Sequence, residues 1–209
     1  MSLAFQDLFG IRDAFAGIAF NGRTDAWLVA TAAQAHGIAA DSPDLGRFPS
    51  LYLNHLSREL HRPGPRKGVM PGIEPLLDVL GSRDEAYLAL LTGNYETGAR
   101  LKLEYFDLWR YFTCGAFGDA AFDRNGLLPT AISQIRACGG PVVSASQIVV
   151  IGDTPLDVAC ARAGGARSIA VATGGHSAEE LTASGADVVF DTLADTEQVL
   201  SAIHRLTVG

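Results

Sequence analysis

Two carboxylates follow a short apolar run in residues 148–157, whose sequence is IVVIGDTPLD. The β-branched run predicts a buried parallel strand, and Pro155 suits the first turn of a following helix. Asp153 would then end the strand and Asp157 would lie in the first turn of the helix. Both would face the crevice in which ligands of open α/β sheets bind. Because like charges repel at close range, the pair predicts a bound cation, and Mg²⁺ is the usual ion where phosphate oxygens complete the coordination shell.

A second polar group follows another apolar run, in residues 90–94 with the sequence LLTGN. Thr92 offers a hydroxyl and Gly93 an unobstructed backbone N–H, a pair that can hold a phosphate oxygen near a helix N-terminus. Lys102, early in the helix expected from Glu96, could neutralise a carboxylate or a phosphate. Each signal is weak alone, since Thr-Gly at a strand end is commonly only a turn and a lone helix lysine is commonly solvated.

Strands and helices alternate from Met70 to the C-terminus, which is typical of an α/β fold with a parallel sheet covered on both faces. Ser177 and Glu180 fit a capping box at the start of one helix. Apolar runs and helical periodicity predict the other elements. The expected strands are 88–91, 112–117, 147–152, 168–172 and 188–190, and the expected helices 73–80, 96–109, 129–138, 155–163 and 195–205.

The N-terminal part has a different pattern. Residues 3–62 hold apolar positions at helical spacing and no convincing strand, so we expect three helices there, with a break near Pro49. The basic, Pro- and Gly-rich segment 61–68 is the expected boundary. The sequence therefore predicts a small helical domain at 1–68 and an α/β domain at 69–209.

Composition excludes several classes of function. The net charge of −7 argues against nucleic acid or an anionic membrane as a partner, and the apolar runs are all shorter than the roughly 20 residues of a membrane span. Hydrophobic residues make up 48% of the chain, enough for a sizeable core. The three cysteines, Cys114, Cys138 and Cys160, lack metal-site spacing, so we expect small buried thiols and a cytoplasmic location. The oligomeric state does not follow from the sequence.

Thr92, Lys102 and residues 152–157 match, in order, the second, third and fourth motifs of the haloacid dehalogenase-like (HAD) superfamily, which the chain resembles along nearly its whole length. The acidic motif is fairly specific, whereas the other two are specific only in combination. By this resemblance, residues 1–68 are the helical cap domain and residues 69–209 the Rossmann-like core.

The resemblance implies Mg²⁺-dependent phosphoryl transfer from a small-molecule phosphate ester through an aspartyl-phosphate. Asp153 would bind Mg²⁺, and Asp157 would bind it or orient it through water. Thr92 and the Gly93 N–H would hold the transferring phosphoryl group, and Lys102 would offset charge between nucleophile and phosphate.

Two further residues are candidates for substrate binding. Residues 22–25, with the sequence GRTD, are similar to a segment common in phosphoglycolate-phosphatase-like members, and Arg23 could bind an anionic substrate tail. A salt bridge within the cap is the more common role for such an arginine. Asn94 could contact substrate or cap, although local turn capping explains it equally well.

One family motif is absent. The first motif, Asp-x-Asp, carries the nucleophile and the general acid/base, and no Asp-x-Asp occurs in this sequence. In the family it ends the first core strand, between the strands expected here at 88–91 and 147–152. We therefore expect about 20–25 upstream residues to be missing ahead of Met1. Without them, two strand edges face a gap, and each unpaired buried backbone group costs about 1–3 kcal/mol.

Several functions remain open at this stage. A phosphatase comes first, with a phosphosugar mutase as a variant that shares the core motifs. A haloacid dehalogenase needs no Mg²⁺, so Asp153 and Asp157 count against it. A non-catalytic binding protein would have lost the first motif. For the 209 residues taken literally we expect little or no turnover, because no nucleophilic Asp is present.

Overall fold

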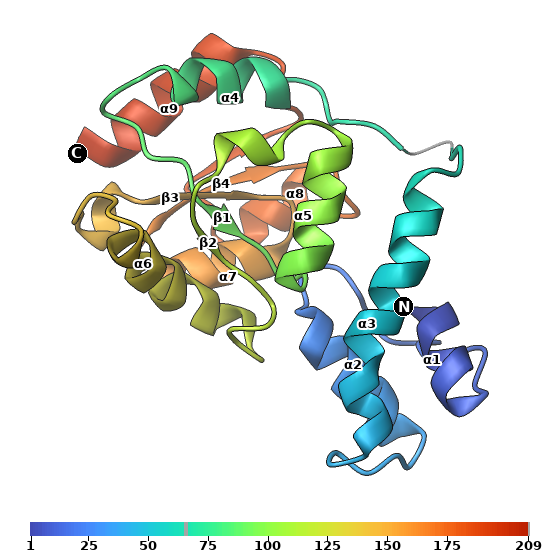
Figure 1. The fold of residues 1–209 in the computed structure, drawn as a ribbon. Coiled ribbons are helices and arrows are strands. Elements are labelled where there is room, and N and C mark those ends of the chain that lie inside the picture. Colours follow the sequence, from blue (N-terminus) through green and yellow to red (C-terminus); the bar gives the residue numbers. More distant parts are fainter. Residues whose placement is uncertain (65–66, 209) are drawn as a thin grey trace.

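The computed structural model describes residues 1–64 and 67–208, so part of the expected boundary segment 61–68 lies outside the described residues. The N-terminal helices are α1 (Ser2–Phe9), α2 (Asp25–Ala35) and α3 (Pro43–Leu60), grouped at one end of the molecule (Figure 1). They enclose an apolar core of their own around the fully buried Phe5 and Phe48. Three helices without a strand were expected here, but the predicted break at Pro49 is wrong. Pro49 lies inside α3, which continues to Leu60.

Helices and short parallel strands alternate through the rest of the chain. In order these are α4 (Ile73–Gly81), β1 (Leu90–Leu91), α5 (Glu96–Tyr105), β2 (Gly115–Ala116), α6 (Leu127–Ala137), β3 (Val149–Gly152), α7 (Pro155–Ala163), β4 (Arg167–Val171), α8 (Ala178–Ala183), β5 (Val188–Phe190) and α9 (Thr196–Val208). Single turns of 3₁₀ helix are η1 (Trp109–Tyr111), η2 (Arg124–Gly126) and η3 (Ala145–Gln147).

The strands form two parallel sheets, which confirms the α/β class. In the first, Leu90 and Leu91 of β1 lie opposite Gly115 and Ala116 of β2. In the second, β4 lies between β3 and β5. Helices α4 and α9 cover one side of the strands, and α6 and α7 the other (Figure 1).

The core is built mostly from the central strand and its covering helices. Ile169 and Ala170 of β4 are almost fully buried. Val158 of α7 and Leu181 of α8 pack with Ala170, while Val171 packs with residues of α4 and α9. These contacts fix the position of β3 and the loop that follows it.

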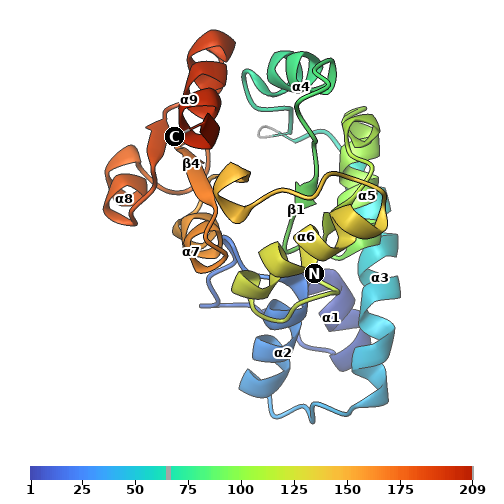
Figure 2. The ribbon, with the colours of Figure 1, turned by 90° about the vertical axis from the view of Figure 1, so that its left-hand side faces the viewer.

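The two sheets are separated. Among the described residues, β1 pairs only with β2, and β3 pairs only with β4. Figure 2 shows β1 standing apart from the strands of the second sheet. An apolar groove of about 500 Å³ lies between them, lined by both β1 and β3. The sheet is therefore broken where the sequence predicts an empty strand position, and the upstream strand itself stays a prediction.

The cysteines differ from expectation. Cys114 and Cys138 form a disulfide with their Cα atoms 6.5 Å apart, and only Cys160 is a buried free thiol. The prediction of three thiols is wrong because β2 and the end of α6, distant in sequence, lie side by side. Because of this disulfide, the cysteines no longer support a cytoplasmic location, which stays a prediction. Within the described ranges, every helix is too short or too polar to cross a membrane.

Candidate functional site

The loop after β3, residues 153–157, is called the acidic turn here. Thr154 caps α7, and Pro155 occupies its first turn. Asp157 completes a capping box, since its Oδ2 accepts hydrogen bonds from Thr154 N at 3.0 Å and from Thr154 Oγ1 at 2.8 Å. Gly152 is needed for this approach, because a Cβ there would lie 2.2 Å from Asp157 Cγ.

Arg124 is the cation in contact with the acidic turn. Its Nη2 donates to Asp157 Oδ1, and its Nη1 donates to the Gly22 carbonyl at 3.1 Å. The side chains of Arg124 and Asp157 are only 12% and 7% exposed. The Arg124 Nε is buried and has no hydrogen-bond partner within the described part of the chain. The Nε–H of this buried guanidinium is thus a donor without an acceptor among the described residues.

Arg124 was missed from the sequence. It lies in η2, between β2 and α6, and a single arginine before a helix carries no signal by itself. Its partner Asp157 is 33 residues away. Only the fold shows that these two residues meet.

Asp153 is the more accessible of the two carboxylates. Desolvation and then the neighbouring Asp157 raise the pKa of Asp153, while Arg124 and His176 act in the opposite direction. Its partner Asp157 already has both oxygens engaged by Thr154 and Arg124. Asp153 is therefore the carboxylate of this turn with free lone pairs for a ligand.

The loop after β1 is held by backbone contacts. Thr92 N donates to Ala116 O at 3.0 Å, and Thr92 Oγ1 accepts from Asn94 N at 3.2 Å. Gly93 packs so closely on the N-terminal part that a Cβ at this position would lie 2.3 Å from Arg23 O. The hydroxyl of Thr92 thus stabilises its own turn through this hydrogen bond. A turn was one of the two roles expected for Thr92, the other being phosphate binding.

Lys102 belongs to a network at this loop. Its Nζ donates to Asn94 Oδ1 at 2.9 Å, and Asn94 Nδ2 donates to Asp25 Oδ1 at 3.4 Å. Tyr95 N donates to Asp25 Oδ2 at 2.9 Å. Burial lowers the pKa of Lys102, and burial raises that of Asp25, which is 3% exposed. The structure therefore joins Lys102 to Asn94, whereas the contact with the acidic turn is made by Arg124.

Residues 22–25 link the two strand ends. The Gly22 carbonyl accepts from Arg124 beside the acidic turn. Thr24 Oγ1 donates to Phe122 O at 2.8 Å, and Asp25 N donates to Gly93 O at 2.7 Å after β1. One short segment thus holds the loops after β1 and β3 on the same side of the molecule.

Arg23 faces a cavity beside these contacts. Its guanidinium lies 4.3 Å from the centre of the Trp27 ring. The cavity, of about 330 Å³, is also lined by Tyr52, Asn94 and Lys102. Arg23 and Lys102 place two cations at this cavity beside the carboxylate of Asp25, which also lines it, so Arg23 stays a candidate for binding an anionic substrate group.

Asp25 provides a stability prediction. Asp25→Ala should lower the free energy of unfolding by about 1–3 kcal/mol, because it leaves the Tyr95 N–H buried without an acceptor. Asp25→Asn keeps an acceptor and should cost less stability.

The pH dependence of stability follows from the raised pKa of Asp25 in the folded state. Above about pH 4 the native protein binds more protons at this carboxylate than the unfolded chain does. The stability of the wild type therefore falls as the pH rises through the folded-state pKa.

The Asp25→Asn variant should lack that fall, so its stability relative to wild type should improve as the pH rises. Urea denaturation at a series of pH values measures this. A constant difference between the two proteins would show that Asp25 does not titrate differently on folding.

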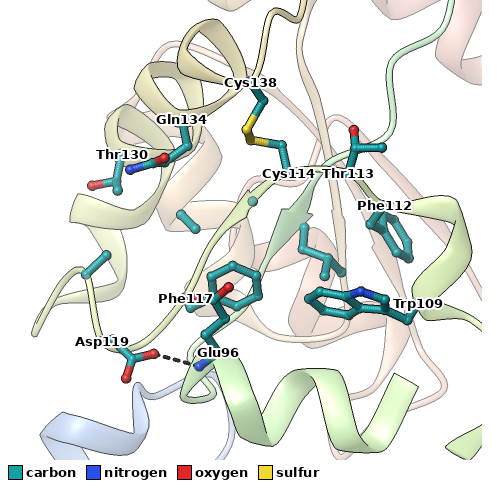
Figure 3. Close-up of a pocket in the computed structure, with 14 residues that line it drawn as sticks. Glu96, Trp109, Phe112, Thr113, Cys114, Phe117, Asp119, Thr130, Gln134 and Cys138 are labelled. Atoms are coloured by element: carbon teal, nitrogen blue, oxygen red, sulfur yellow. Dashed lines mark hydrogen bonds between the residues drawn. A yellow bond between two sulfur atoms is a disulfide. The ribbon is translucent and has the colours of Figure 1, made fainter. Parts of the chain in front are cut away.

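A separate pocket of about 250 Å³ lies beside β2 and the Cys114–Cys138 disulfide (Figure 3). At one end, Asp119 Oδ2 accepts from Glu96 N at 2.6 Å and helps to begin α5. Trp109 and Phe117 stack across it. The candidate site residues do not line this pocket, so it is distinct from the site.

Comparisons with known proteins agree with this geometry. Residues 126–196 match the HAD-hydrolase-like family model. Over 173 residues the chain is 32% identical to a phosphoglycolate phosphatase of Rhodospirillum rubrum, covering 80% of this chain and 68% of that protein. The chain belongs to the HAD-like superfamily.

Other matches extend this result. A probable phosphatase, IndB, of Dickeya dadantii is 30% identical over 144 residues, or 66% of this chain and 57% of that protein. The crystal structure of a hydrolase from Pseudomonas syringae has a TM-score of 0.68 at 19% identity, with coverage of 96% of this chain and 92% of the other. The likeness to the Pseudomonas syringae hydrolase supports the fold. The chain spans less than two thirds of the length of IndB.

Proposed function

We propose that this chain belongs to an Mg²⁺-dependent phosphatase that hydrolyses a small phosphate ester through an aspartyl-phosphate. The observation that carries the proposal is the meeting of the two strand-end loops at residues 22–25. A buried guanidinium, Arg124, lies at this meeting point, and the free carboxylate Asp153 is near enough for Arg124 to act on its pKa. The phosphatase relatives support the same class of reaction.

The donor set suits Mg²⁺ in part. In the described residues, no three His, Cys, Asp or Glu side chains form a metal cluster. Mg²⁺ commonly uses one or two carboxylates and completes its shell with water and substrate phosphate. Asp153 fits such a ligand, whereas Asp157 is engaged by Thr154 and Arg124 and fits the orienting role. Bound there, the ion would neutralise charge on the transferring phosphoryl oxygens.

The other residues would bind and position the phosphoryl group. The Gly93 N–H and the Thr92 hydroxyl lie at the end of β1 and would donate to its oxygens. Arg124, which pairs with Asp157 in the acidic turn, would supply there the positive charge assigned to Lys102 from the sequence. Lys102 would act on the substrate side, with Arg23, where both line the cavity of about 330 Å³.

An assay of the protein purified from its own cell tests the proposal. Phosphate release from an aryl phosphate that depends on Mg²⁺ and is lost in Asp153→Asn supports it. Halide release from a haloacid, independent of Mg²⁺, would replace it with dehalogenation. Neither activity would leave a non-catalytic binding protein that has lost the first motif. Interconversion of two sugar phosphates would identify a phosphosugar mutase.

A further inference from the structure

We propose that the Cys114–Cys138 disulfide is a reversible redox switch, which a dithiol reductant opens and which sets how firmly β2 and α6 hold the loop after β1. Cys114 comes directly before β2, and Cys138 directly follows α6. The bond therefore joins a strand of the first sheet to the helix that packs on it (Figure 3). It closes a loop that contains β2, η2 and α6.

The disulfide is accessible to a thiol. Cys138 is exposed and Cys114 is half-buried. Both line the pocket of about 250 Å³, together with Trp109 and Phe117 (Figure 3). Exchange requires a thiolate to reach one of the two sulfur atoms, so Cys138 Sγ is the expected point of attack.

The third cysteine does not compete for this chemistry. Cys160 of α7 is fully buried, and its Sγ donates to Arg124 O at 3.1 Å. Burial raises the pKa of this thiol, which leaves less of the reactive thiolate. Exchange is therefore confined to Cys114 and Cys138.

The reaction balances with a dithiol as the reductant. One thiolate of the dithiol attacks Cys138 Sγ, the bond to Cys114 breaks, and the Cys114 sulfur leaves as a thiolate that takes up a proton. The second thiolate of the dithiol then displaces the Cys138 sulfur, which is protonated in turn. Two electrons pass from the dithiol, which becomes a disulfide, to the cysteine pair, which becomes two thiols. The reverse reaction, with a disulfide as the oxidant, closes the switch.

The bond acts on the loop after β1 through β2. Leu90 N donates to Cys114 O at 2.9 Å, and Thr92 N donates to Ala116 O at 3.0 Å. Within the described residues, β2 is the one strand that pairs with β1. Opening the disulfide frees the end of α6 from β2, so these contacts should loosen. Any consequence for phosphate binding rests on the proposed function, whereas the switch itself does not.

Thiol counting tests the switch itself. After treatment with excess oxidised glutathione, the full chain should have one free thiol, that of Cys160, and a mass lower than the reduced chain by two hydrogen atoms. Incubation of the folded protein with dithiothreitol should expose two further thiols. A disulfide that dithiothreitol reduces only after unfolding in urea would be structural and would overturn the proposal. Three thiols after the oxidising treatment, or attached glutathione, would overturn it as well.

Amide hydrogen exchange tests the consequence without using enzyme activity. In the reduced chain, exchange of the Leu90 and Thr92 amides should become about tenfold faster or more, because the cross-link no longer limits local opening. The Ala172 amide, which donates to Phe190 O at 2.8 Å in the second sheet, should exchange at an unchanged rate. Equal exchange of Leu90 and Thr92 in both redox states would overturn the proposal. An equal acceleration at Ala172 would show a general loss of stability and would also overturn it.

Cysteine variants assign the response to this pair. The double variant Cys114→Ser and Cys138→Ser cannot form the bond and should exchange like the reduced chain, with or without dithiothreitol. Cys160→Ser keeps the disulfide and a donor for Arg124 O, so it should respond to dithiothreitol like the wild type. A response of the double variant, or loss of the response in Cys160→Ser, would overturn the assignment.

Discussion

The 209-residue chain should release phosphate from an aryl phosphate in the presence of Mg²⁺ no faster than buffer. Loss of a catalytic nucleophile costs on the order of 10⁶-fold in kcat in a well-studied case. No Asp-x-Asp motif exists in these residues, and the two buried carboxylates near the strand ends, Asp25 and Asp157, already have other partners. Asp25 accepts from Tyr95 N, and Asp157 pairs with Arg124. A continuous phosphate-release assay measures the rate.

The matched control is Asp153→Asn in the same chain. Mg²⁺-dependent turnover that disappears in this variant would mean that the 209 residues contain a complete site, and the prediction would be wrong. Turnover that survives in Asp153→Asn would instead remove Asp153 from the metal site. Binding of Mg²⁺ followed by calorimetry, weaker in Asp153→Asn, separates metal affinity from chemistry.

Arg124→Met should lower the free energy of unfolding by about 3–5 kcal/mol, because it leaves the buried Asp157 carboxylate without its cation. The same change should free the Gly22 carbonyl and loosen residues 22–25 from the acidic turn. Urea denaturation, with a comparison of midpoint and m-value, measures the effect.

Two variants make this result specific. Asp157→Asn keeps an acceptor for Thr154 and removes the charge, so the double variant with Arg124→Met should be more stable than Arg124→Met alone. Arg100→Met breaks the exposed pair with Glu104 and should change stability little. An Arg124→Met protein as stable as the Arg100→Met protein would show that the buried pair contributes nothing.

Local signals predicted several elements well. Residues 155–163 and 188–190 were expected as a helix and a strand, and α7 and β5 have these bounds. The capping box of Ser177 and Glu180 is present. Each of these features depends on neighbouring residues, such as a cap, a proline in the first turn or a β-branched run, so the sequence contains the required information.

Features that depend on tertiary pairing were predicted less well. Strands were expected at 88–91 and 112–117, but only Leu90–Leu91 and Gly115–Ala116 pair. Strand length is limited by the neighbouring strand, and within the described part of the chain β1 has a neighbour on a single edge. The family motif order pointed to Lys102, while the cation at the acidic turn is Arg124, which the fold brings there from a loop that no local pattern marks.

Residues 22–25 also have a consequence for the order of folding. Their contacts close long loops, with a sequence separation of 70 between Asp25 and Tyr95 and of 102 between Gly22 and Arg124. Loop-closure entropy rises with loop length, and contacts between distant residues slow folding. The individual strand–helix units can therefore form before this segment docks. The arrangement that we propose binds phosphate should then be the last part of the molecule to form during folding and the first to be lost under mild denaturation.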